Sequence, residues 1–190
     1  MEPRVSDPGL FVGTIVRLAD CLDAAGAPAL LVGGLAVARH GYGRQTLDVD
    51  VLISDAHIAA VECRLRAAGF LNIERMENAV LFSAPSGGWR IDVLLTDSAT
   101  FDTMRRRALP AALGGRMFAV PCLEDLLAMK IFSLRHGGAR REHKDLPDII
   151  QLIVANRSDL EKTVRPLCSR YADDAVYEKI RVGVEQCRTI

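Results

Sequence analysis

The sequence predicts an α+β protein: a mixed β-sheet packed by helices, followed by a helical subdomain. Segments with strand and helix patterns alternate up to Pro121, and only helix-like segments follow it. Hydrophobic residues make up 49% and charged residues 25% of the 190 residues, which is typical of a globular chain. We therefore expect a core over residues 1–120 and a helical subdomain over residues 121–190.

The predicted core begins with a helix that starts at Asp7-Pro8 and ends at Gly26, because apolar residues recur there at helical spacing. Further helices are expected at 35–40, from Ser54 or Asp55 to Gly69, and at 101–109. Strands are expected at 29–32, 48–53, 71–75, 79–84, 89–96 and 116–120. A turn at Pro85-Ser86-Gly87-Gly88 would join two of these strands. From Leu123 onward we predict helices with breaks near 137–138 and Asn156.

Composition excludes several classes of protein. Lysine plus arginine equals aspartate plus glutamate, so the net charge is zero, and aromatic residues are only 5%. A generally basic or aromatic-rich nucleic-acid binder is therefore excluded. The five cysteines form no CxxC pair, and the longest apolar run, 27–38, is too short for a bilayer. With no signal-peptide pattern at the N-terminus, we expect a cytoplasmic protein without a membrane segment.

Asp48 and Asp50 are the first candidate catalytic and metal-ligating residues. Two residues apart on a strand, they point to the same side with Cα atoms about 6.6 Å apart. That spacing lets two carboxylates share a pair of metal ions for phosphoryl or nucleotidyl displacement. The alternative is a half-exposed strand whose carboxylates only face water.

Two further features accompany this pair. Gly33-Gly34 ends a strand and begins a helix, where open backbone lets N–H groups approach a polyanion, although a tight turn alone would also need glycine. Asp92 lies among apolar residues of a later strand and needs a cation or a donor, and Arg90 is the simplest partner.

Together these segments resemble the DNA polymerase β-like nucleotidyltransferase superfamily. The resemblance rests on Leu31-Val32-Gly33-Gly34, on Arg44-Gln45-Thr46-Leu47-Asp48-Val49-Asp50-Val51, and on two helical segments, 123–130 and 144–149. The most similar branch holds the abortive-infection (AbiEii-type) toxin-like nucleotidyltransferases and minimal relatives. The resemblance implies a nucleotidyltransferase-type mixed sheet and transfer of a nucleoside monophosphate from a triphosphate such as ATP to a hydroxyl.

The resemblance also implies residue roles. Asp48, Asp50 and Asp92 would hold two Mg²⁺ ions, and Asp92 would help to deprotonate the acceptor. Gly33 and Gly34 would hold the triphosphate, Arg44 would neutralise phosphate, and Thr46 would brace the acidic strand.

Two lysines complete the expected nucleotide site. Lys130 would contact phosphate, unless it is a surface lysine, and Lys144 would lie near the nucleotide. Asp145 and Asp148 would support these lysines, although Lys144 and Asp148 could form only a helix salt bridge.

The acceptor is the open part of the prediction. RNA such as tRNA is favoured, with a basic strip of Arg135, Arg140, Arg141 and Lys144 beside the site, and an antitoxin protein is a possible partner. A small-molecule acceptor such as an antibiotic is the first alternative. A catalytically idle relative that binds nucleotide or a partner protein is the second.

Overall fold

The computed structural model describes residues 8–85 and 89–188. Contacts within the chain group these residues into two compact units. The first unit holds the described residues up to Leu35 together with Gln45–Pro121, and the second holds Ala36–Arg44 and the residues from Cys122 onward. The segment Ala36–Arg44 thus belongs with the helical residues, although it lies well before residue 121 in the sequence.

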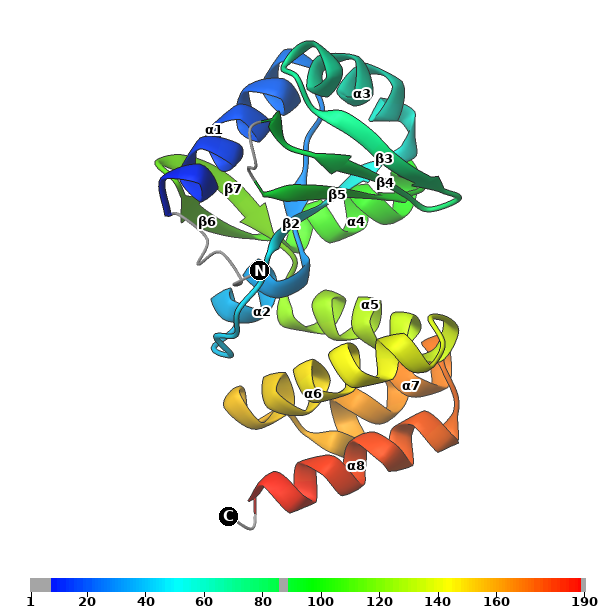
Figure 1. Ribbon diagram of the computed structural model, residues 1–190. Helices are drawn as coiled ribbons and strands as arrows, with labels where there is room; N and C mark the ends of the chain where they lie inside the picture. The colour runs from blue at the N-terminus through cyan, green and yellow to red at the C-terminus, as the bar shows by residue number, and fades with distance from the viewer. Residues whose placement is uncertain (1–7, 86–88, 189–190) are drawn as a thin grey trace. The chain divides into compact units, whose positions relative to one another are not determined.

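A seven-stranded mixed sheet forms the centre of the first unit, which confirms the predicted fold class (Figure 1). The strands are β1 (Leu30–Leu31), β2 (Asp48–Ser54), β3 (Leu71–Met76), β4 (Ala79–Ser83), β5 (Arg90–Thr96), β6 (Leu109–Leu113) and β7 (Arg116–Val120). Their order across the sheet is β3-β4-β5-β2-β1-β7-β6. The pairs β2–β5 and β1–β7 are parallel, and the other neighbouring pairs are antiparallel.

Strand β2 is buried on both sides rather than half exposed. Val49, Val51 and Ile53 on one face are fully buried, and Leu52 on the opposite face is 4% exposed. The strand lies in the middle of the sheet, so neighbours on both edges satisfy its backbone groups. The alternative in which the β2 carboxylates simply face water on a half-exposed strand does not fit this burial.

Three helices of the described residues lie within the first unit: α1 (Pro8–Ala24), α3 (Ile58–Ala67) and α4 (Ser98–Arg107). Helix α2 (Gly33–Arg39) begins in this unit, and its residues from Ala36 onward belong to the second. Helix α1 packs against α3, and α4 contacts β2. Before α3 lies a short 3-10 turn, Asp55–His57, in which the hydroxyl of Ser54 accepts a hydrogen bond from the N–H of Ala56. This serine is therefore the helix cap expected near residue 54.

The structure corrects the expected helix over 101–109. Helix α4 begins at Ser98, because the Asp97 carboxylate caps it through the N–H of Thr100, and it ends at Arg107. Leu109 instead begins β6, a strand that the sequence pattern did not predict. Gly114 and Gly115 both have positive φ and form the turn back into β7. Pro110 is tolerated because β6 is an edge strand.

The second unit is helical, with α5 (Leu123–His136), α6 (Ala139–Ala155), a π-helical turn (Leu160–Val164), α7 (Arg165–Tyr171) and α8 (Asp174–Arg188). The breaks fall near 137–138 and Asn156, as the sequence predicts. The Asn156 amide donates to the carbonyl of His40 at 2.8 Å, which ties the segment Ala36–Arg44 to the end of α6.

Two sequence predictions fall outside the described residues: the helix start at Asp7 and the turn residues Ser86-Gly87-Gly88. Among the residues that are described, no helix has the length and apolar character needed to cross a bilayer.

Candidate active site

The register between β2 and β5 places four charged side chains on one face of the sheet. Asp48 lies directly opposite Arg90, and Asp50 lies directly opposite Asp92. Side chains two residues apart on a strand share a face, so all four project to the same side. Three of these four side chains are carboxylates.

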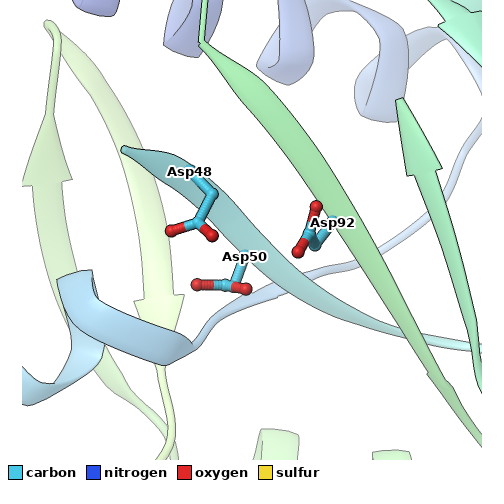
Figure 2. Close-up of side chains that lie close together, drawn as sticks. All are labelled: Asp48, Asp50 and Asp92. Atoms are coloured by element: carbon cyan, nitrogen blue, oxygen red, sulfur yellow. The ribbon is translucent and has the colours of Figure 1, made fainter. Parts of the chain in front are cut away.

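The three carboxylates converge. Asp48, Asp50 and Asp92 each offer an oxygen, and these oxygens lie within 4.8 Å of one another. Figure 2 shows Asp48 and Asp50 on β2 and Asp92 on the neighbouring β5, with their carboxylates gathered together. Asp50 is 8% exposed, and the side chains of Asp48 and Asp92 are each 14% exposed. Like charges at such short range repel unless a cation lies between them.

Arg90 and Thr46 contact this carboxylate cluster from within the first unit. The Arg90 guanidinium contacts both oxygens of Asp92, at 2.8 and 3.1 Å, and Oδ2 of Asp48 at 3.0 Å. Thr46 donates its hydroxyl to Oδ1 of Asp48 at 2.7 Å. Partial burial works against the charged guanidinium, but the charges and hydrogen bonds of Asp92 and Asp48 raise the pKa of Arg90 above its ordinary value.

Gly33 begins α2 beside the same cluster. The N–H of Val32 donates to the carbonyl of Asp50 at 2.9 Å, so the end of β1 lies against β2 at the acidic residue. Gly33 has φ +55°, and a Cβ built on it would lie 1.8 Å from Oδ2 of Asp50. Only glycine leaves room for this carboxylate, which is a reason for Gly33 in addition to the expected phosphate contact.

The donor set fits a hard divalent cation. Magnesium prefers oxygen ligands and is commonly held by one or two carboxylates together with substrate phosphates. The cluster supplies only carboxylate oxygens, on two paired strands with fixed register. Asp48, Asp50 and Asp92 are therefore the residues that would hold such an ion.

The second unit contains a separate cluster of buried charges. Lys130 on α5 contacts Asp145 at 2.9 Å and Asp148 at 2.7 Å, and the Ser133 hydroxyl donates to Asp145 at 2.7 Å. Arg44 binds Asp148 through Nε at 2.6 Å and through a terminal nitrogen at 2.9 Å. The side chains of Lys130, Asp145 and Asp148 are 8%, 3% and 1% exposed, so these charges depend on one another.

The pKa of Asp148 reflects this arrangement. Burial alone would raise it, but the hydrogen bond from Arg44 and the charge and hydrogen bond of Lys130 outweigh burial and lower the pKa. Both carboxylate oxygens of Asp148 are engaged by Arg44 and Lys130, so this acid anchors the segment Ala36–Arg44 to the helices of its unit.

The predicted site residues thus fall into two groups. Gly33, Thr46, Asp48, Asp50 and Asp92 gather in the first unit, with Gly34 buried in the first turn of α2. Arg44, Lys130, Asp145 and Asp148 gather in the second, and Lys144 lies half-buried on α6.

Sequence reasoning did not single out Ser133 as part of the second cluster. A signal existed, because Ser133 lies three residues after Lys130, on the same face of a predicted helix. The roles of these residues toward a nucleotide remain predictions.

One arginine of the predicted basic strip forms an ion pair within the second unit. Arg135 pairs with Asp173 at 2.8 Å, so its charge is compensated. The side chain of Arg140 lies outside what the structure describes, while Arg141 is exposed.

Three converging carboxylates on paired strands suit metal-assisted transfer of a phosphate group, and comparison with known proteins gives the class of protein. The chain belongs to a family described as "Uncharacterised nucleotidyltransferase", whose model matches residues 9–176. No curated protein matches the sequence. The narrower AbiEii toxin-like placement remains a prediction.

Solved structures share the fold at low sequence identity. The structure of ANT(2″)-Ia in complex with adenylyl-2″-tobramycin has a TM-score of 0.60 at 15% identity, over 90% of this chain and 97% of that one. The lincomycin-bound lincosamide antibiotic adenylyltransferase LnuA has a TM-score of 0.51 at 14% identity, over 77% and 98%. An antigenic nucleotidyltransferase-like protein from Paracoccidioides brasiliensis has a TM-score of 0.50 at 21% identity, over 90% and 92%. These likenesses show the fold.

Proposed function

We propose that the protein transfers a nucleoside monophosphate from a nucleoside triphosphate to a hydroxyl group, with Mg²⁺ held by Asp48, Asp50 and Asp92. The observation that carries this proposal is the convergence of the three carboxylates within 4.8 Å, on paired strands of a chain that belongs to a nucleotidyltransferase family. Two Mg²⁺ ions are expected, because two-metal sites clamp both the attacking and the leaving oxygen of an in-line displacement.

The reaction forms a bond between the acceptor oxygen and the α-phosphorus and breaks the bond from that phosphorus to pyrophosphate. Bound Mg²⁺ would supply charge stabilisation for the phosphate oxygens. The family resemblance gives the Asp92 carboxylate the role of accepting the hydroxyl proton, and its side chain is 14% exposed, as is that of Asp48. Asp50 is the most buried of the three, so it would ligate the metal and would not take part in proton transfer.

The test is a turnover assay on the full chain with each of the four common ribonucleoside triphosphates and Mg²⁺. Turnover is measured as the release of pyrophosphate. Asp92→Asn should reduce turnover at least about a hundredfold, as expected when a proton acceptor and metal ligand is lost. Asp102→Asn on α4 is the matched control, because Asp102 is an exposed aspartate outside the carboxylate cluster. Equal turnover of wild type and Asp92→Asn would refute the assignment.

RNA is the acceptor that the sequence analysis favours. If RNA is the acceptor, its binding should weaken with salt, because each neutralised phosphate releases a counterion. Changing Arg140 and Arg141 together to Ala should flatten the log–log salt slope by about one to two units and spare triphosphate binding. RNA binding that does not change with salt concentration would contradict RNA as the acceptor.

A small hydroxylated molecule is the second candidate acceptor. The pairing of Arg135 with Asp173 favours it, because the Asp173 carboxylate offsets part of the positive charge of the strip on which RNA would depend. Two of the similar folds are described with tobramycin and lincomycin, so these compounds are suitable first acceptors in the assay. Nucleotide transfer to either compound, but not to RNA, would establish the small-molecule class.

A further inference from the structure

We propose that Arg90 is a built-in counter-cation of the carboxylate cluster, which stabilises the metal-free protein and must be displaced when a divalent metal binds. This inference rests on the proposed function, because it concerns the same three carboxylates. Beyond the pairing with Asp92 that the sequence suggests, it assigns Arg90 control of metal affinity.

The first argument is geometric. On these two strands, Asp50 faces Asp92 and Asp48 faces Arg90, so one arginine shares the face with three acids. Nε of Arg90 lies 2.8 Å from Oδ1 of Asp92, and a terminal nitrogen lies 3.1 Å from Oδ2. A terminal nitrogen also lies 3.0 Å from Oδ2 of Asp48. The guanidinium therefore links the two strands through two of the carboxylates that would hold a metal.

The second argument concerns the oxygens that remain for a metal. Both oxygens of Asp92 contact Arg90, and the two oxygens of Asp48 contact Arg90 and Thr46. A divalent ion ligated by Asp92 and Asp48 would compete with this guanidinium for the carboxylate lone pairs. It would also lie next to a fixed positive charge, which lowers its affinity.

The third argument is that Arg90 can leave without disturbing the core. Its side chain is 43% exposed, whereas Ile91 and Val93 on the other face of β5 are fully buried. A long arginine side chain can rotate into solvent while the strand and its carboxylates stay in place. Arg90 is thus a positioning residue in the metal-free state and a competitor of the metal.

The experiment measures Mn²⁺ binding by calorimetry and metal-dependent thermal stability, without nucleotide, so that the readout does not depend on turnover. Four proteins are compared: wild type, Arg90→Gln, Asp50→Asn and Arg75→Gln. Arg75 on β3 pairs with Glu62 and serves as the matched control for the loss of one surface arginine–carboxylate pair in the same unit. A fifth protein, Arg90→Lys, keeps the positive charge but lacks the planar guanidinium group that contacts two oxygens at once.

Arg90→Gln should bind Mn²⁺ about tenfold or more tightly than wild type, because removing a unit charge beside a divalent ion strengthens the interaction. Without metal, Arg90→Gln should melt at a lower temperature, since three carboxylates then repel one another, and Mn²⁺ should raise its melting temperature more than that of wild type. Arg90→Lys should bind Mn²⁺ with intermediate affinity, and Arg75→Gln should match wild type.

Equal or weaker Mn²⁺ binding by Arg90→Gln, with binding lost in Asp50→Asn, would overturn the role of Arg90 and leave the metal site intact. Mn²⁺ binding that is the same in wild type, Arg90→Gln and Asp50→Asn would instead overturn the metal site, and with it the proposed function.

Discussion

Gly33 and Asp50 are in such close contact that a methyl group on Gly33 would lie 1.8 Å from Oδ2 of Asp50. The contact follows from the backbone, because the N–H of Val32 donates to the carbonyl of Asp50 and Gly33 then turns with φ +55°. This glycine is therefore needed for two independent reasons: its positive φ and the carboxylate that fills the space of a side chain.

Gly33→Ala tests this relationship. We expect the substitution to displace the Asp50 carboxylate and to weaken Mn²⁺ binding in addition to lowering stability. Gly26→Ala is the matched control, since Gly26 has φ +60° and no atom within 4 Å of a built Cβ. It should lose about 1–2 kcal/mol from the left-handed backbone alone and keep its Mn²⁺ affinity. Urea unfolding and calorimetry measure both effects, and equal behaviour of the two variants would contradict the contact.

Lys130→Met tests whether the buried cluster of the second unit stabilises the fold. The variant leaves Asp145 and Asp148 buried with one cation fewer, so unfolding should become easier by about 3–5 kcal/mol. The same substitution at Lys179, whose pair with Glu142 is exposed, should have a much smaller effect. If Lys130 acts only as a phosphate contact, its variant would instead lose triphosphate affinity at unchanged stability. Urea denaturation and nucleotide titration separate these outcomes.

Asp148 should make stability depend on acid pH. Its pKa is lower in the folded protein than in the unfolded chain, so its stabilising contribution is present above about pH 4 and is lost as the pH falls through the folded pKa. Wild type should therefore lose free energy of unfolding more steeply below about pH 4 than Asp148→Asn does. Urea midpoints between pH 3 and pH 6 measure the two slopes, and parallel slopes would show that Asp148 does not titrate in this way.

The five cysteines should differ in reactivity. Burial, with a further contribution from Asp173, raises the pKa of Cys168 to about 11, and burial also raises the pKa of Cys21. Cys63 is exposed. A thiol reagent at pH 8 should label Cys63 first and reach Cys21 and Cys168 only after denaturation, because the thiolate is the reactive form. Cys63→Ser should remove the fast phase, and labelling of Cys168 in the native protein would contradict the burial.

Most elements of the fold follow from local patterns, and the exceptions have physical reasons. Strand β2 was predicted from its alternation, and its carboxylates from their spacing of two. Strand β6 was not, because Pro110 and two alanines have no strand pattern. That strand exists only because β7 provides a partner at the edge of the sheet.

The sequence by itself determined the α+β class and the three acidic residues, because alternation on a strand and glycine at a turn are local consequences of backbone geometry. Only the tertiary structure decided which charges meet. The β2–β5 register places Arg90 opposite Asp48, and packing of α5 on α6 places Lys130 against Asp145 and Asp148. These pairings join residues 15 to 42 positions apart, so they depend on strand register and helix packing, which no local pattern encodes.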